Sequence, residues 1–199
     1  MYFAKIISHL FHPLFLPTAG LFLIFNMGEL SLWAPPHEMQ LFLYLITFSA
    51  TCVLPLLNAV FLLKTKQIHS LEMKTKQERR IPYLATAIFY FSAAYLLMKV
   101  EVPALVKAMM MGASLFVAIV LLINLFWKIS AHMAGIGGLC GMMIAISARL
   151  HITIHYLLIA LFLVAGLLAF ARLLLNAHRP AEVYVGFLLG LALQLVLFL

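Results

Sequence analysis

The segment 171–186 (ARLLLNAHRPAEVYVG) holds three side chains whose types and spacing suit phosphoryl transfer. Arg172 is followed by His178 six residues later and by Glu182 four residues after that, between apolar segments where a charge is costly without a partner or a function. A carboxylate near an imidazole fixes its tautomer and raises its nucleophilicity. A guanidinium offers forked donors to phosphate oxygens. The series therefore predicts a histidine that attacks a phosphoryl group.

Pro180 predicts how these side chains are positioned. Proline fits the first turn of a helix, where its missing N–H is not needed. A helix that begins there carries Glu182 back toward His178. The alternative is purely structural, with charges near the helix ends that serve only as one another's partners.

A second candidate cluster is the segment 128–132 (KISAH), directly before a glycine-rich helix. The start of that helix would aim free backbone N–H groups at an anion, with Ser130 as its cap. His132 could protonate a leaving oxygen. In the alternative, Lys128 is an ordinary lysine at the membrane interface, and the glycines only allow close helix packing.

A third candidate cluster lies in the loop 64–81, the only long hydrophilic segment of the chain. Its Lys74, Arg79 and Arg80 could hold phosphate oxygens. The alternative is an orientation signal, because basic loops commonly flank membrane spans.

The remaining histidines suggest weaker hypotheses. His9 and His12 are interpreted as interface residues, with a lipid headgroup or the mouth of the site as the other possible contact. His151 and His155, next to Arg149, have a helical spacing that could ligate a metal or haem. A haem- or quinone-binding membrane anchor is therefore a third interpretation of the chain.

Composition sets the fold class. Of the 199 residues, 66% are hydrophobic and only 10% are charged, which indicates a polytopic helical membrane protein. We predict an all-α transmembrane bundle that forms one integral membrane domain, 1–199, and retains its first apolar segment as a span. Crossing a membrane takes about 20 apolar residues. Seven segments qualify: 6–27, 40–63, 82–99, 103–127, 132–149, 152–175 and 183–199.

The acidic residues and the cysteines exclude several kinds of site. All six acidic residues are glutamates, which excludes aspartate-rich magnesium sites and intramembrane proteases with paired aspartates. Cys52 and Cys140 lie in apolar segments, so we predict neither a disulfide nor a thiolate metal site. No metal, no cofactor and no nucleic-acid partner is predicted.

The number of spans predicts that the three clusters converge. With seven spans, the loops 64–81, 128–131 and 176–182 are each separated by two crossings, so all three emerge on the same side of the membrane. Most of the 13 basic residues share that side. The positive-inside rule would make it cytoplasmic, unless those residues are there to bind phosphate.

The three clusters resemble the motifs of the type 2 phosphatidic acid phosphatases, a family of integral membrane lipid phosphatases. The family's third motif is Ser-Arg, five residues, His, three residues and Asp, and here Ala171-Arg172, His178 and Glu182 keep that order and spacing. Its second motif, Pro-Ser-Gly-His, resembles the segment 129–132 (ISAH). Its first motif is Lys, six residues and Arg-Pro. Lys74 and Pro82 keep that spacing, with the arginine one place early.

The resemblance implies a metal-independent hydrolase of phosphoric monoesters or diphosphates. His178 would attack phosphorus and form a phosphohistidine, Glu182 would orient it, and His132 would protonate the leaving oxygen. The phosphate would be held by the remaining motif residues: Lys74, Arg79, Arg80, Ser130, Ala131 and Arg172. The implied partner is a membrane lipid phosphate such as undecaprenyl diphosphate, phosphatidate or phosphatidylglycerol phosphate. The implied location is the lipid bilayer of a bacterial inner membrane, where such relatives generally act on the outer side.

A non-catalytic protein that binds or transports a lipid phosphate is the alternative function. Such a protein would keep the basic groups and would not need the nucleophile. The altered second motif favours this alternative.

Overall fold

The computed structural model describes residues 1–73 and 75–199, except for the side chain of Trp33. Within these residues all regular structure is helical. The α-helices are α1 (Tyr2–Leu10), α2 (Leu16–Asn26), α3 (His37–Phe48), α4 (Leu54–Lys64), α5 (Arg80–Lys99), α6 (Ala104–Phe126), α7 (Ala131–Leu150), α8 (His155–Leu174) and α9 (Pro180–Phe198). Short 3-10 helices, η1 (Pro13–Phe15) and η2 (Gly28–Trp33), and a π-helix, η3 (Ser49–Val53), join some of them.

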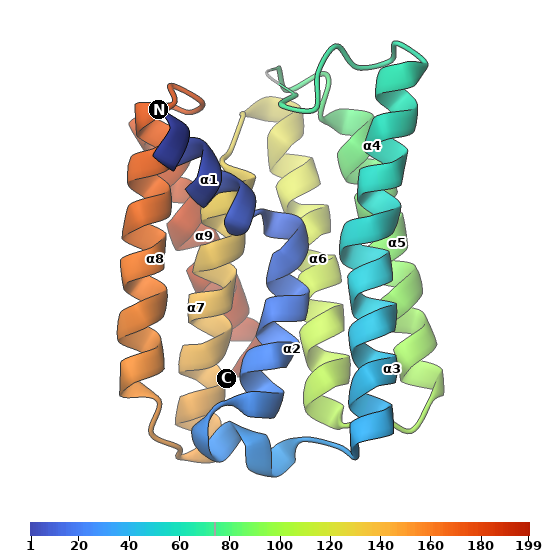
Figure 1. Cartoon of the computed structure of the whole chain (residues 1–199), viewed down its shortest axis with the longest axis vertical. Coiled ribbons are helices and arrows are strands. Elements are labelled where there is room, and N and C mark those ends of the chain that lie inside the picture. The colour runs from blue at the N-terminus through green and yellow to red at the C-terminus, as the bar shows by residue number, and fades with distance from the viewer. Residues whose placement is uncertain (74) are drawn as a thin grey trace. The chain divides into compact units, whose positions relative to one another are not determined.

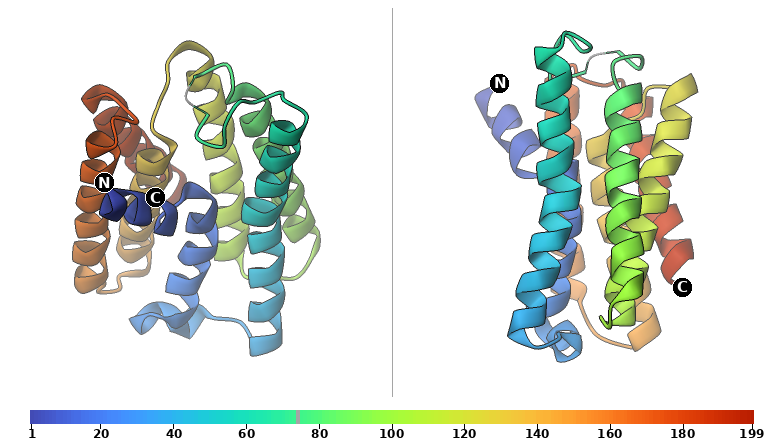
Figure 2. Two further views of the ribbon diagram at one scale, coloured as in Figure 1. Left: turned by 45° about the horizontal axis from the view of Figure 1, so that its top comes forward. Right: turned by 90° about the vertical axis from the view of Figure 1, so that its right-hand side faces the viewer.

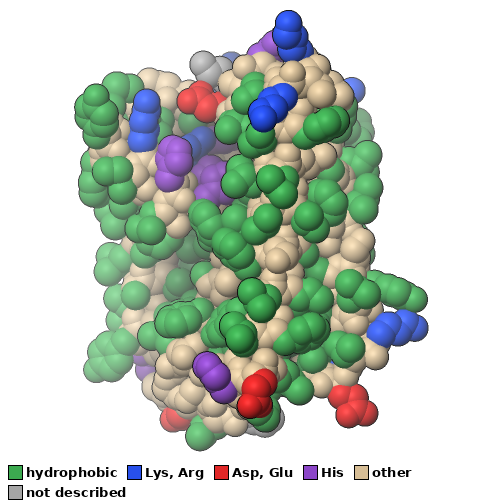
Figure 3. All heavy atoms as spheres, turned by 45° about the vertical axis from the view of Figure 1, so that its right-hand side comes forward, with side chains coloured by type: hydrophobic (Ala, Val, Ile, Leu, Met, Phe, Trp, Pro, Cys, Tyr) green, Lys and Arg blue, Asp and Glu red, His purple; other side chains and the backbone are tan. Residues whose placement is uncertain are grey.

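The predicted spans are confirmed. Seven helical segments are long and apolar enough to cross a membrane: Tyr2–Asn26, His37–Lys64, Arg80–Lys99, Ala104–Phe126, Ala131–Leu150, His155–Leu174 and Pro180–Phe198. On the face drawn in Figure 3, hydrophobic side chains cover the sides of the helices, and charged side chains lie near the helix ends. The chain is therefore an integral membrane protein.

Two of the seven spans are not regular helices throughout. The first is interrupted at His12, whose backbone is extended before Pro13 begins η1. The second contains η3 directly before Pro55, which has no N–H to donate to the carbonyl of Thr51. The hydroxyl of Tyr90 donates to that carbonyl instead, at 3.5 Å, so the freed acceptor is satisfied from another helix.

The helices form two compact units, which we describe separately. Unit 1 comprises Met1–Leu16, Asn26–Leu32 and Ile129–Leu199, and unit 2 comprises Pro17–Phe25 and Trp33–Lys128. The prediction of a single domain, 1–199, stays a prediction.

In unit 2, α3, η3 and α4 form one continuous rod that packs on α5, and α5 packs on α6 (Figures 1 and 2). The basic loop is fixed to the end of α6. Asn124 donates from Nδ2 to the carbonyl of Lys76 (3.0 Å), and Nζ of Lys76 donates to the carbonyl of Phe126 (3.1 Å). Lys76 therefore satisfies a carbonyl that the C-terminus of α6 leaves open.

In unit 1, α7 and α9 form the most extensive helix pair of the described chain, and α8 packs beside both (Figure 1). Glycine makes this pair possible. A methyl group on Gly137 or Gly141 would collide with the backbone oxygen of Phe187 or Leu191, respectively. Small residues four apart allow helix backbones to approach this closely in membranes.

The α7–α9 pair is also fixed at both ends. The N–H of Ser130 donates to the carbonyl of Glu182 at the start of the two helices (3.2 Å). At their other end, Nη1 of Arg149 donates to the carbonyl of Phe198 (3.3 Å). The two helices therefore run parallel, and their N-termini meet where Ser130 contacts Glu182.

Candidate functional site

His178 and Glu182 form a buried pair in unit 1. Nδ1 of His178 donates to Oε2 of Glu182 at 2.6 Å, and the two residues are only 7% and 8% exposed. Helix α9 begins at Pro180, as predicted, and places Glu182 in its first turn. A carboxylate on Nδ1 leaves Nε2 as the ring nitrogen that carries the lone pair, which is the tautomer that a nucleophilic histidine requires.

A helix-terminating motif sets the distance from Arg172 to His178. Arg172 lies in the last turn of α8, and the chain reverses at Asn176, which has a φ of 49°. The N–H of Asn176 donates to the carbonyl of Leu173 (2.9 Å), and the N–H of Ala177 donates to the carbonyl of Arg172 (3.2 Å). This is the Schellman pattern of helix ends, and asparagine is one of the few side chains that tolerate its left-handed position.

The second cluster lies beside this pair. Ser130 is the N-cap residue of α7, and Ala131 is the first residue of that helix. Our expectation that the Ser130 side chain caps α7 is wrong, because the residue makes its contacts through its backbone to Glu182 and Ala134. Its hydroxyl is fully buried and has no hydrogen-bond partner among the described residues. A buried hydroxyl without a partner is unfavourable, and a ligand oxygen would satisfy it.

His132 lies in the first turn of α7 and contacts the N-terminal segment. Its Nε2 is 3.0 Å from the carbonyl oxygen of Ser8, and its ring meets the ring of His12 edge-on, with centroids 5.1 Å apart. Arg172 and His178 both lie within electrostatic range of His132. Unit 1 therefore gathers the predicted nucleophile, its carboxylate, the predicted acid and one arginine.

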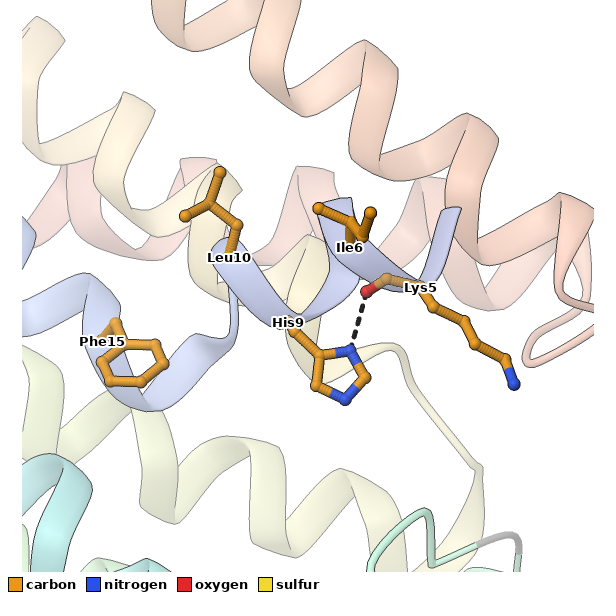
Figure 4. A pocket seen from close by; sticks show the side chains of 5 residues that line it. All are labelled: Lys5, Ile6, His9, Leu10 and Phe15. Carbon is orange, nitrogen blue, oxygen red and sulfur yellow. Dashed lines mark hydrogen bonds between the residues drawn. The ribbon is translucent and has the colours of Figure 1, made fainter. Parts of the chain in front are cut away.

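Of the alternatives for His12, the structure favours a contact with the site over a position at the membrane interface. Its ring meets the ring of His132, and its own Nδ1 accepts from the N–H of Leu14 (3.4 Å). The signal in the sequence was a His-Pro pair inside an apolar segment. The neighbouring His9 is exposed and donates from Nδ1 to the carbonyl of Lys5 (2.7 Å), beside a shallow hollow of about 720 Å³ (Figure 4).

The basic residues of the first motif belong to unit 2. Arg79 is buried, and its Nε donates to the carbonyl of Met73 (2.9 Å), whereas Arg80 is exposed at the start of α5. Lys74 lies outside the described residues. The structure thus brings together the predicted site residues that belong to unit 1. Arg79 and Arg80 belong to unit 2.

The carboxylate of Glu78 stabilises the loop that precedes these arginines. The backbone N–H groups of His69 and Thr75 donate to the carboxylate of Glu78 at 3.0 and 3.3 Å. These hydrogen bonds lower the pKa of Glu78 below its usual value of 4.5.

The histidine pair proposed as a metal or haem site does not have the expected geometry. His151 ends α7 with a left-handed backbone, and His155 begins α8, so the two are not one turn apart on a single helix. No group of three or more His, Cys or Glu side chains that could hold a metal ion occurs in the described part of the chain.

No protein-family model, no curated protein and no solved structure matches this chain.

Proposed function

We propose that this protein is a membrane lipid phosphatase that hydrolyses a lipid mono- or diphosphate through a phosphohistidine on His178. The observation that carries the proposal is the 2.6 Å contact between Nδ1 of His178 and Oε2 of Glu182. It holds the imidazole in the tautomer that leaves Nε2 nucleophilic. The resemblance to the type 2 phosphatidic acid phosphatases supports the same chemistry. We propose, on the same grounds, that the helices of this chain include the phosphatase core of that family.

In the first step, Nε2 of His178 attacks phosphorus, an N–P bond forms, and the P–O bond to the lipid breaks. His132 gives a proton to the departing oxygen. In the second step water attacks the phosphohistidine, His132 takes the proton of that water, and inorganic phosphate leaves. The imidazole of His178 is then restored beside Glu182.

Charge on the transferring phosphoryl group needs donors that are already in place. Arg172 and the N-terminus of α7, with Ser130 and Ala131, supply such donors in unit 1. The buried hydroxyl of Ser130 is suited to a phosphate oxygen, because nothing in the described chain satisfies it. We include Arg79, Arg80 and Lys74 in the proposal as further phosphate ligands, on the strength of the motif spacing alone.

The test is phosphate release from a panel of lipid mono- and diphosphates in detergent with EDTA present. The wild-type protein is compared with His178→Ala, and with His155→Ala as a control histidine outside the site. Metal-independent turnover that His178→Ala abolishes and His155→Ala preserves is the expected result. Turnover that survives in His178→Ala would contradict the mechanism.

Absence of turnover on every lipid phosphate would favour the alternative, a protein that binds or transports lipid phosphates. The replacement of the motif glycine by Ala131 favours that alternative. Such a binding protein would be identified by two results. Arg172→Ala should weaken the binding of a lipid phosphate, and His178→Ala should leave that binding intact.

A further inference from the structure

The N-terminal segment, residues 1–16, contacts the candidate site at several points. α1 packs on α8, and η1 packs on α7. Gly135 makes room for this contact, since a methyl group there would approach Leu16 Cδ1 to 2.6 Å and Pro13 Cβ to 3.4 Å. The segment is therefore seated on the same two helices that carry Arg172 and His132.

One of these contacts determines where His132 carries its proton. Nε2 of His132 is 3.0 Å from the carbonyl oxygen of Ser8. A carbonyl oxygen only accepts hydrogen bonds, so Nε2 must be protonated. In the neutral ring, Nδ1 then has the lone pair.

A second contact restricts the orientation of the same ring. The rings of His12 and His132 lie 82° from parallel with centroids 5.1 Å apart. His12 cannot turn freely, because its Nδ1 accepts from the N–H of Leu14 and its ring packs edge-on against Phe15. Ser8 thus fixes one nitrogen of His132, and His12 limits rotation of the ring.

We propose that the N-terminal segment is a working part of the site: it holds His132 as the Nε2–H tautomer, so that Nδ1 exchanges the proton with the substrate. His12 is a positioning residue in this arrangement. When His132 is protonated, the Nδ1 proton goes to the leaving oxygen, and the ring returns to the neutral Nε2–H form. Nδ1 then takes a proton from the water that attacks the phosphohistidine. The catalytic meaning of this inference rests on the proposed phosphatase function.

The tautomer can be measured without turnover. Protein labelled with ¹⁵N-histidine in detergent gives separate ¹⁵N signals for protonated and unprotonated ring nitrogens, and His132→Gln assigns the signals of His132. We expect a protonated Nε2 and an unprotonated Nδ1 in the neutral ring. A protonated Nδ1, or averaged signals from both tautomers, would overturn the inference.

Two glycine variants test whether the N-terminal segment causes this preference. Gly135→Leu should displace η1, so that His132 exchanges between its two tautomers and gives averaged ¹⁵N signals. Gly166→Leu is the matched control, because Gly166 also lies within a membrane helix but has no atom within 4 Å of the place that a Cβ would take. Unchanged His132 signals in a folded Gly135→Leu protein would contradict the role of the segment.

Activity separates positioning from direct proton transfer by His12. We expect His12→Leu to lower kcat about 10- to 100-fold with little change in KM, a smaller loss than removal of the general acid itself would cause. His12→Phe has no titratable nitrogen but keeps a flat ring that can pack against Phe15 and His132, so it should lose less of kcat than His12→Leu. His9→Leu, at the exposed neighbouring histidine, should match the wild type.

Equal losses in His12→Phe and His12→Leu would overturn the positioning role. If the wild-type protein hydrolyses no lipid phosphate, the proposed function fails, and the ¹⁵N measurement still decides whether Ser8 fixes the tautomer of His132.

Discussion

Nδ1 of His178 and Oε2 of Glu182 lie 2.6 Å apart, within one turn of the start of α9. The contact is buried, so water competes with it little. Two residues only four positions apart therefore form the arrangement of a histidine activated by a carboxylate.

Glu182→Gln should lower kcat by a factor of about 10² to 10⁴, between the smallest loss typical of a general acid–base group and the loss of about 10⁴ when a carboxylate that orients a catalytic histidine becomes an amide. The amide can donate to Nδ1 and so favours the tautomer with a proton on Nε2, where the attack on phosphorus occurs. Steady-state phosphate release measures the effect. Glu101→Gln, at an exposed glutamate between α5 and α6, is the control. Wild-type kcat in Glu182→Gln would remove Glu182 from the mechanism.

Arg172→Lys should lower kcat/KM about 10- to 100-fold. Lysine keeps the positive charge but loses the planar fork that binds two phosphate oxygens. The comparison is with Arg179→Lys, an exposed arginine seven residues away. Equal kinetics in both variants would show that Arg172 contributes charge alone or nothing to the phosphate site.

Gly137→Ala and Gly141→Ala should each destabilise the protein by about 1–3 kcal/mol, the usual cost of overpacking a well-packed interface. In both cases the added methyl group meets backbone atoms of α9, which cannot move aside independently. Unfolding in mixed detergent measures the free energy. Gly166→Ala has open space and should be neutral or slightly stabilising. Stability equal to wild type in all three would contradict the close approach of α7 and α9.

The Glu78 carboxylate predicts how the loop responds to acid. The pKa of Glu78 is lowered in the folded protein. The contribution of this carboxylate to the stability of the loop is therefore fully present above the unfolded-state pKa, and it is lost as the pH falls through the lower, folded-state pKa. Amide hydrogen exchange, corrected for the intrinsic pH dependence, should show protection of His69 and Thr75 at neutral pH and its loss in acid. Glu78→Gln should weaken this protection at neutral pH, and Glu101→Gln should leave it unchanged.

Local sequence patterns predict much of this protein. Each span is a continuous apolar segment, so hydropathy alone finds all seven. The facing of His178 and Glu182 follows from Pro180, because proline marks the helix start and a first-turn carboxylate then points back toward the preceding loop. These features depend only on neighbouring residues.

Features that depend on distant residues, or on breaks within apolar segments, could not be predicted in the same way. The interruption at His12 and the π-helix before Pro55 do not change hydropathy. The contact from His132 to Ser8 joins residues 124 positions apart, and no local spacing encodes it. The backbone contact from Ser130 to Glu182 likewise joins two helices that are distant in the sequence, and no local pattern encodes it.

The most direct test of the central claim is to trap the phosphorylated protein. Wild-type protein and His178→Ala are mixed with a lipid phosphate that the wild type hydrolyses, quenched in alkali, and digested for mass spectrometry. We predict a phosphate on His178 of the wild type that is stable in alkali and lost in acid, and no phosphorylated histidine in His178→Ala. Turnover without any phosphate on His178, or with the phosphate on another residue, would contradict the account.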